Sequence, residues 1–112
     1  MPQSERYRVG LIGCGRIGSE WDAVPPVRAQ THAGAFYAHP RCDLVAGANR
    51  GQERLEAFGR KWGVSGLYRD FAQMLAREAL DIVCIATHPE QHHEQVLAAV
   101  EAGAKAIFCE KP

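Results

Sequence analysis

The stretch YRVGLIGCGRIG, residues Tyr7 to Gly18, decides how the chain is expected to fold. Its first half is short, apolar and rich in residues that favour strands, so Tyr7 to Ile12 is predicted to be a β-strand. Gly13, Gly15 and Gly18 follow at the spacing G-x-G-x-x-G. Directly after a strand and inside a β-α-β unit, that spacing is typical of a turn that cradles a dinucleotide pyrophosphate. The alternative interpretation is a strand-to-helix turn without a ligand.

Each glycine of this turn has its own physical task. Gly13 permits the tight turn, Gly15 lets a pyrophosphate approach the backbone, and Gly18 lets the next helix pack close to the strand. The unpaired N–H groups at the start of that helix, at Arg16 and Ile17, attract phosphate oxygens. These five residues are the first expected cofactor-binding residues.

Apolar runs and helical spacings alternate along the rest of the chain. The expected later strands are Leu44 to Ala48, Gly66 to Tyr68, Asp81 to Ala86 and Ala104 to Cys109. The expected helices are Gln52 to Trp62 with its stop at Gly63, the segment around Phe71 to Leu75 after its N-cap Asp70, and Pro89 to Ala102 with its stop at Gly103. This alternation predicts an α/β fold of the Rossmann type. We expect one domain over residues 1–112, with a parallel sheet in the order 3-2-1-4-5 and helices on both faces.

The residues after the glycine turn do not fit one continuous helix. The pair Pro25-Pro26 arrives within two turns of Gly18, and a proline pair breaks a helix. Asn49, at the end of the second predicted strand, lies 31 residues after Gly18. The usual distance to this position is about 20 residues, so about 11 are in excess. We therefore predict an insertion over Ser19 to Gln30.

The insertion divides the first helix into two expected pieces. A first helical turn is predicted near Arg16 to Trp21, and a second piece over His32 to Ala38. Because the insertion starts one turn from the glycines, one interpretation places it near the ligand edge of the sheet. The other interpretation is a surface loop without function.

The end of the second strand bears on the choice of cofactor. A carboxylate there would bind a ribose 2′-hydroxyl and repel a 2′-phosphate, but the residue is Asn49. Arg50 follows directly and Arg54 lies one helical turn further on. Arginine suits bidentate phosphate binding, so NAD(P) is the expected cofactor, with a tilt towards NADP. The alternative is that both arginines are solvated helix-start residues.

Composition excludes several classes of protein. Of the 112 residues 46% are hydrophobic, and 13 basic residues balance 13 acidic ones, so no basic surface for nucleic acid is expected. No segment suits a signal peptide or a membrane span. The four cysteines form no C-x-x-C pair, and Cys84 and Cys109 lie in apolar runs, which predicts buried free thiols. A cytoplasmic protein without nucleic-acid or membrane partners is expected.

Three segments together resemble one family of enzymes. They are VGLIGCGRIG, HAGAFYAHPRCDLVAGANR and LYRDFAQMLAREALDIVCIATHPEQHHEQVLAAVEAGAKAIFCEKP. The resemblance covers nearly the whole chain outside Ser19 to Gln30. The resemblance is to the glucose–fructose oxidoreductase, inositol dehydrogenase and rhizopine-catabolism (Gfo/Idh/MocA) oxidoreductases. It implies an N-terminal Rossmann domain, while the family's C-terminal α+β domain is absent from these residues. It also implies hydride transfer between nicotinamide and a sugar, inositol or related polyol.

The resemblance assigns roles at the ends of the fourth and fifth strands. Lys111 corresponds to the family's catalytic lysine, which contacts the reacting oxygen, and Glu110 would sit by the nicotinamide ribose. Ala86, Thr87 and His88 would face the cofactor. The family often has Pro-Asn where this chain has His88 and a proline, which changes the contacts expected at that corner.

The resemblance further implies a small polyol or sugar as substrate and a homo-oligomer formed through the missing domain. Two other functions stay open: a non-catalytic protein that binds or senses a dinucleotide, and a Rossmann-like domain for another nucleotide. The terminal Glu110-Lys111-Pro112 favours the oxidoreductase over both. His88, His92 and His93 lie close in sequence, but no set of carboxylates or cysteines completes a tetrahedral site, so no metal is expected.

Overall fold

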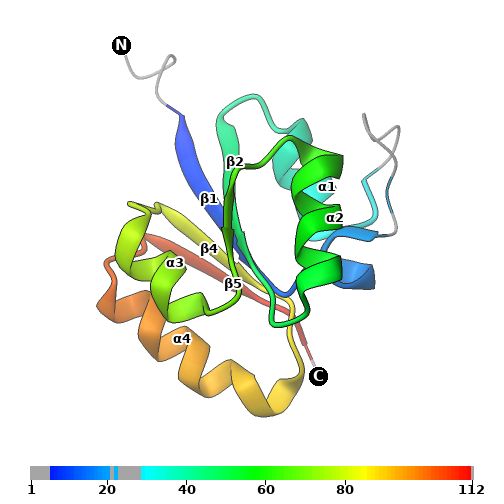
Figure 1. The fold of residues 1–112 in the computed structure, drawn as a ribbon. Coiled ribbons are helices and arrows are strands. Elements are labelled where there is room, and N and C mark those ends of the chain that lie inside the picture. The colour runs from blue at the N-terminus through cyan, green and yellow to red at the C-terminus, as the bar shows by residue number, and fades with distance from the viewer. Residues whose placement is uncertain (1–5, 21, 23–28, 112) are drawn as a thin grey trace.

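The computed structural model describes residues 6–20, 22 and 29–111. Within them lies a five-stranded sheet in the order β3-β2-β1-β4-β5 (Figure 1). The strands are β1 (Tyr7–Ile12), β2 (Cys42–Ala48), β3 (Gly66–Tyr68), β4 (Ile82–Ile85) and β5 (Ala106–Cys109). All four pairings of neighbours are parallel, which confirms the predicted sheet and its order 3-2-1-4-5.

Helices cover both faces of the sheet (Figure 1). They are α1 (His32–Ala38), α2 (Gln52–Trp62), α3 (Phe71–Arg77) and α4 (His92–Glu101), with a π turn η2 (Arg16–Glu20) and a 3₁₀ turn η3 (Pro89–Gln91). The helices α1 and α2 lie on one face, and α3 and α4 lie on the other. Right-handed crossovers explain this arrangement, because the chain moves from β1 to β3 in one direction along the sheet and from β3 to β5 in the other.

Local sequence signals explain where the helices begin and end. Asp70 caps α3, because its carboxylate accepts a hydrogen bond from the Ala72 N–H at 2.9 Å. Thr31 caps α1 by accepting from the Gly34 N–H at 3.0 Å. Gly63 ends α2 with φ of 68°, in the left-handed region that glycine adopts without strain. The predicted N-cap and stop are confirmed at Asp70 and Gly63.

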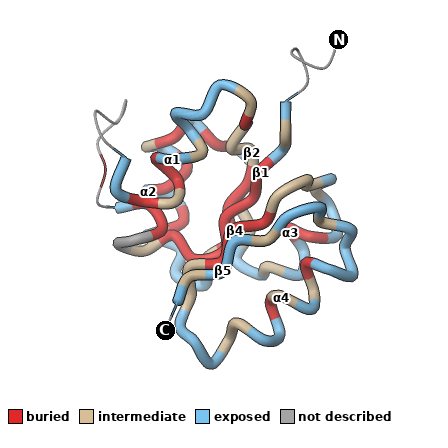
Figure 2. The backbone as a smooth tube through the Cα atoms, turned by 180° about the vertical axis from the view of Figure 1, so that it is seen from behind, coloured by how far each residue is buried: buried red, intermediate tan, exposed pale blue. Residues whose placement is uncertain are grey.

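The core consists of two layers, one on each face of the sheet. Successive residues of β1 point to opposite faces, so Leu11 packs towards α1 and α2 while Ile12 packs towards α3 and α4. Figure 2 shows buried residues running through the central strands and along α1 and α2, whereas α4 is mostly exposed or intermediate. Trp62 of α2 is buried in the first layer. The central strands are therefore held rigidly on both sides.

Several element boundaries differ from the prediction. β2 begins at Cys42, two residues before the expected Leu44, because Cys42 pairs with Tyr7 of β1. The helix expected over Pro89 to Ala102 is divided into η3 and α4, since the chain first turns in 3₁₀ geometry at the proline. The strands β4 and β5 are shorter than predicted. All of these differences lie at element ends and leave the topology unchanged.

The outer strand β5 corrects one prediction about burial. The sequence predicts a buried Cys109, but the structure exposes this thiol, whereas Cys84 on β4 is buried as predicted. In the described residues β5 pairs with β4 along one side and ends the sheet on the other. Phe108 is correspondingly 54% exposed. An apolar run on an edge strand looks the same in sequence as one on a central strand.

The sequence predicts that η2 and α1 are not parts of one unbroken helix, and the described residues confirm this. Asp22 and residues 29–31 lie outside any helix, and α1 restarts at the predicted residue. The turn predicted near Arg16 to Trp21 is present as the wider π turn η2. Trp21 and Pro25-Pro26 lie outside the described residues.

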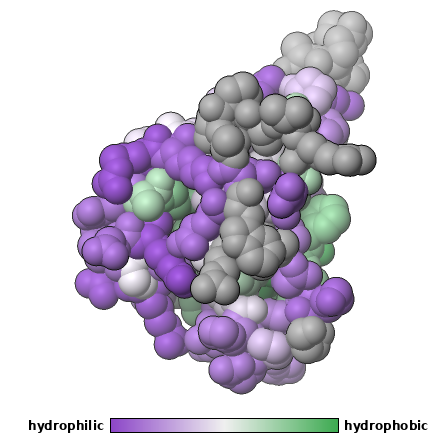
Figure 3. Space-filling model, turned by 90° about the vertical axis from the view of Figure 1, so that its right-hand side faces the viewer, coloured by the Kyte–Doolittle hydropathy of each residue, from purple (hydrophilic) through white to green (hydrophobic). Residues whose placement is uncertain are grey.

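One face of the molecule is largely polar. Figure 3 shows this face, on which hydrophilic residues dominate and hydrophobic ones are confined to separate spots. Across residues 6–20, 22 and 29–111, no helix has the length and apolar character needed to cross a membrane.

Candidate functional site

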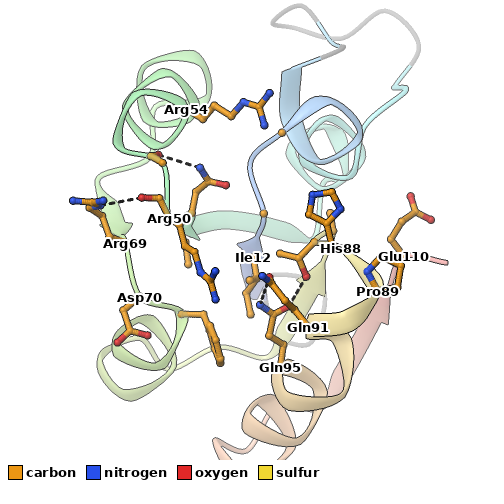
Figure 4. Close-up of a pocket in the computed structure, with 18 of the residues that line it drawn as sticks. Ile12, Arg50, Arg54, Arg69, Asp70, His88, Pro89, Gln91, Gln95 and Glu110 are labelled. Carbon is orange, nitrogen blue, oxygen red and sulfur yellow. Dashed lines mark hydrogen bonds between the residues drawn. The ribbon is translucent and has the colours of Figure 1, made fainter. Parts of the chain in front are cut away.

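A cavity of about 860 Å³ opens at the carboxyl edge of the sheet. Its walls come from the glycine turn after β1, the ends of β2, β4 and β5, and the starts of α2 and α3. Figure 4 shows Arg50, Arg54 and Arg69 on one side of the cavity, and His88 and Glu110 on the other. In open parallel sheets, ligands bind at this edge where the strand order reverses, which here lies between β1 and β4.

The glycine turn lies in the middle of this cavity. Gly13 has φ of 97°, which strains any residue with a side chain. A Cβ at Gly13 would lie 2.8 Å from the Ala86 carbonyl oxygen, and a Cβ at Gly18 would collide with the Gly13 carbonyl. Gly15 lines the cavity with bare backbone. This cradle, which side chains would fill, fits a pyrophosphate group.

Asn49 occupies the end of β2, where a carboxylate is usual. Its Oδ1 accepts from the Cys14 N–H at 3.0 Å, and its Nδ2 donates to the Gly51 carbonyl at 3.0 Å. Asn49 therefore ties the glycine turn to the start of α2, and its contact with a ribose hydroxyl stays a prediction. Burial raises the pKa of the Cys14 thiol to about 12, so the thiol stays protonated and is no nucleophile.

Three arginines approach the same side of the cavity. The side chain of Arg50 points into it (Figure 4). Arg54 lies close to Gly15, and its Nε is 3.1 Å from a carboxylate oxygen of Glu20. Arg69, which follows β3, donates from Nε to the Arg50 carbonyl at 3.0 Å. Arg69 is brought here because β3 is the neighbour of β2 in the sheet.

The chain turns at Ala86, Thr87 and His88 after β4, and all three residues line the cavity. The Thr87 hydroxyl donates to Oε1 of Gln95 at 2.5 Å, and His92 donates from Nε2 to the Thr87 carbonyl at 2.8 Å. Gln95 is only 3% exposed, so a buried residue of α4 fixes this corner. His92 is committed to the backbone. In the described part of the chain no group of three or more His, Cys, Asp and Glu could hold a metal ion.

Glu110 and Lys111 follow β5 and line the cavity. Glu110 lies at the end away from the arginines (Figure 4). The Glu110 carboxylate accepts from the Lys111 N–H at 3.0 Å and from Nε2 of His32 at 3.1 Å. The hydrogen bond from the Lys111 N–H lowers the pKa of Glu110 most, and the hydrogen bond from His32 lowers it further, so this pKa lies below its usual value. Glu110 is therefore an anion held in one orientation.

Asp22 lies between η2 and α1 and binds the residues directly before α1. Its carboxylate is 7% exposed and accepts from the N–H groups of Gln30 and Thr31 and from the Thr31 hydroxyl. A Cβ at Gly34 would collide with this carboxylate, so the glycine leaves room for it. Burial raises the pKa of Asp22, but the hydrogen bonds from Thr31 and Gln30 outweigh burial and lower it. Asp22 is thus an ionised carboxylate that fixes Gln30 and the N-cap Thr31, directly before α1.

We expect Asp22→Ala to lower the free energy of unfolding by about 2 kcal/mol at neutral pH, because several hydrogen bonds to a charged group are lost. The folded pKa of Asp22 lies below the unfolded value, which is about 3.9. Its stabilisation is therefore complete above that value and is lost as pH falls through the folded pKa. Urea unfolding at several pH values measures the difference, which should shrink below about pH 4. Asp43→Ala, which breaks an exposed pair with Arg6, is the control and should cost less than about 1 kcal/mol. A loss equal to that of the control would contradict the role given to Asp22.

The structure brings most of the predicted site residues to one cavity. Those that line it are Gly13, Gly15, Asn49, Arg50, Ala86, Thr87, His88, Glu110 and Lys111. Arg16, Ile17 and Gly18 form the backbone of η2 that follows the turn. The binding roles of all of these residues stay predictions. Sequence reasoning missed Arg69 as a cavity residue, although the predicted strand order places the end of β3 beside the end of β2. It also missed the contact of His32 with Glu110, because no local pattern in the sequence connects the two residues.

Two curated dehydrogenases are similar to this chain. D-apiose dehydrogenase of Paraburkholderia graminis is 37% identical over 108 residues, which are 96% of this chain and 26% of that protein. Myo-inositol 2-dehydrogenase of Thermotoga maritima is 30% identical over 105 residues, which are 94% of this chain and 28% of that protein. The chain therefore spans little more than a quarter of the length of these relatives.

Solved structures with bound cofactors have the same fold. Scyllo-inositol dehydrogenase from Lactobacillus casei, with NAD(H) and scyllo-inositol bound, matches with a TM-score of 0.80 and 25% identity over 96% of this chain and 28% of that one. A mutant 3-ketoreductase from Actinomadura kijaniata, in complex with TDP-benzene and NADP, matches with a TM-score of 0.77 and 27% identity over 96% of this chain and 31% of that one.

The family comparison covers the part of the chain that builds the sheet and the cavity. Residues 7–112 match the oxidoreductase family with an NAD-binding Rossmann fold, Gfo/Idh/MocA. The glycine cradle, the strand order and the cavity at the carboxyl edge agree with that description. This chain therefore belongs to the Gfo/Idh/MocA family of oxidoreductases, and its residues form the family's NAD-binding Rossmann fold.

Proposed function

We propose that the chain is the NAD(P)-binding domain of an oxidoreductase that transfers hydride between nicotinamide and a sugar, inositol or related polyol. One observation carries the proposal: the cavity has a glycine cradle in its middle, arginines at one end and Lys111 at the other. A dinucleotide has its parts in the same order, with the pyrophosphate between the adenosine and nicotinamide halves. The relatives named for D-apiose and myo-inositol support the substrate class.

The proposal includes a longer protein, in which residues 1–112 are the dinucleotide-binding domain. The curated relatives, of which this chain spans 26% and 28%, support this division. A substrate-binding domain would then supply the rest of the catalytic site, so the 112-residue chain alone should show no dehydrogenase activity. The homo-oligomer expected through that domain stays a prediction.

Within this proposal, each end of the cavity has a separate task. A bound nicotinamide ring would take up or give the hydride. Lys111 would donate a hydrogen bond from Nζ to the reacting oxygen and stabilise its negative charge while the C–H bond breaks or forms. Glu110, ionised and held in place, would accept a hydrogen bond from a ribose hydroxyl. The Thr87 hydroxyl donates a hydrogen bond to the side chain of the buried Gln95, which keeps the cavity wall after β4 fixed.

Binding of NADH and NADPH to the chain tests the proposal and its cofactor preference. We expect NADPH to bind at least as tightly as NADH, because Arg50 and Arg69 can approach a 2′-phosphate and Asn49 carries no opposing charge. The ion pair of Arg54 with Glu20 is exposed and weak, so a phosphate can replace it. We expect Arg50→Ala to weaken NADPH binding about tenfold and NADH binding by less than about twofold, the cost of one charged hydrogen bond.

Titration by nucleotide fluorescence measures both affinities. Arg60→Ala is the matched control, because Arg60 is an exposed arginine on α2, the helix that follows Arg50, and does not line the cavity. A clear preference for NADH that survives Arg50→Ala would contradict the assignment to NADP. Absence of binding by either nucleotide would contradict the proposed function itself.

A further inference from the structure

The carboxyl end of β5 is held by a histidine from a distant part of the chain. His32 is the first residue of α1, and its Nε2 lies 3.1 Å from Oε2 of Glu110. The two side chains are 26% and 28% exposed, so the contact is shielded from water on most sides. Such a half-buried hydrogen bond to a charged group is stronger than a pair on an open surface.

Glu110 is the point at which three constraints meet. Its N–H donates to the Ile85 carbonyl at 2.8 Å, which extends the pairing of β4 with β5 by one residue. Its Oε1 accepts from the Lys111 N–H at 3.0 Å, and its Oε2 faces His32. The carboxylate cannot keep both contacts if it rotates. The orientation of Glu110 and the backbone of Lys111 are therefore coupled to His32.

The start of α1 is rigid enough to act as an anchor. Thr31 caps the helix at the Gly34 N–H, and the buried Asp22 carboxylate holds Thr31 through both its N–H and its hydroxyl. Further along α1, the ring of Phe36 contacts Phe108 of β5 edge-on, with 5.7 Å between the centroids. The helix is thus fixed against β5 by a second contact, one helical turn after His32.

We infer that His32 is a positioning residue: its hydrogen bond holds Glu110, and with it the start of Lys111, at the nicotinamide end of the cavity. The inference rests on the proposed function, which places a nicotinamide ribose at Glu110. The segment after η2 then has a role at the site, because Asp22 and Thr31 fix the start of α1, from which His32 reaches Glu110. A purely structural His32 would stabilise the fold without favouring one half of the cofactor over the other.

The test compares NADH with ADP, which lacks the nicotinamide half. We expect His32→Ala to raise the Kd for NADH about threefold to tenfold and to leave the Kd for ADP within about twofold, because only the nicotinamide end loses its anchor. His32→Gln, which keeps an N–H donor, should restore much of the NADH affinity. Glu110→Gln should show the same selective loss as His32→Ala. The double variant should lose little more than either single one.

An NMR measurement on the free chain is independent of cofactor binding. The amide signal of Lys111 should move in His32→Ala and stay in place in His93→Ala, an exposed control on α4 outside the cavity. Equal losses for NADH and ADP, or an unmoved Lys111 amide, would overturn the inference. If His32→Ala fails to fold, Glu110→Gln and the His32→Gln rescue decide the question. Failure of the wild-type chain to bind NADH and ADP would instead overturn the proposed function, while the Lys111 amide would still report on the anchor.

Discussion

Gly13→Ala is expected to abolish measurable NADH binding and to lower the free energy of unfolding by roughly 2–4 kcal/mol. Two effects combine at this position. The backbone has φ of 97°, which costs a residue with a side chain conformational strain. The new methyl group would also lie 2.8 Å from the Ala86 carbonyl oxygen, at the junction of β1 and β4. Relief of that contact must move the turn that the pyrophosphate is proposed to occupy.

Gly103→Ala separates the two effects. Gly103 has φ of 95°, almost the same as Gly13, but nothing lies within 4 Å of the Cβ that alanine would add. It should therefore cost about 1–2 kcal/mol from strain alone and leave NADH binding unchanged. Urea unfolding and NADH titration of both variants measure this. Tight NADH binding by Gly13→Ala would contradict the cradle as the site of the pyrophosphate.

Much of the fold could be predicted because its signals are local. The glycine spacing after β1, the cap at Asp70 and the stop at Gly63 each depend on a few neighbouring residues, and each is present in the structure. The alternation of strands and helices then indicates the order of the sheet, since right-handed crossovers leave few possible topologies for such a chain. That order indicates which residues meet at the carboxyl edge of the sheet, and nine of the predicted site residues do line one cavity there.

The features that sequence reasoning missed depend on contacts between distant segments. His32 and Glu110 are 78 positions apart, and neither residue type specifies the other. The exposure of Cys109 depends on which strand ends the sheet, although its apolar run suits burial. The amide of Asn49 looks free to bind a ligand in sequence, but in the structure it bonds the backbone of Cys14 and Gly51. Side-chain partners of this kind are fixed by packing.

Lys111→Ala is expected to leave NADH binding by the chain nearly intact and to lower the turnover of the proposed whole enzyme by roughly 10²–10⁴-fold. The reason is the position of the lysine. The glycine turn and the end of β2 would hold the pyrophosphate and adenosine, while Lys111 follows β5 at the other end of the cavity. Its Nζ would contact the reacting oxygen, so its loss acts on the transition state more than on cofactor binding.

Lys105→Ala is the matched control for this prediction. Lys105 directly precedes β5, at the end opposite Lys111. Its side chain is exposed, and its Nζ lies 3.4 Å from Oδ1 of Asp81. It should change neither turnover nor the Kd for NADH. Turnover is measured in the whole enzyme with a panel of sugars and inositols, and the Kd in the 112-residue chain. Normal turnover of Lys111→Ala with the true substrate would contradict the catalytic role of this lysine. A matching rise in the Kd for NADH would show that Lys111 binds the cofactor, because a group that acts only on the reacting oxygen changes kcat and leaves that Kd unchanged.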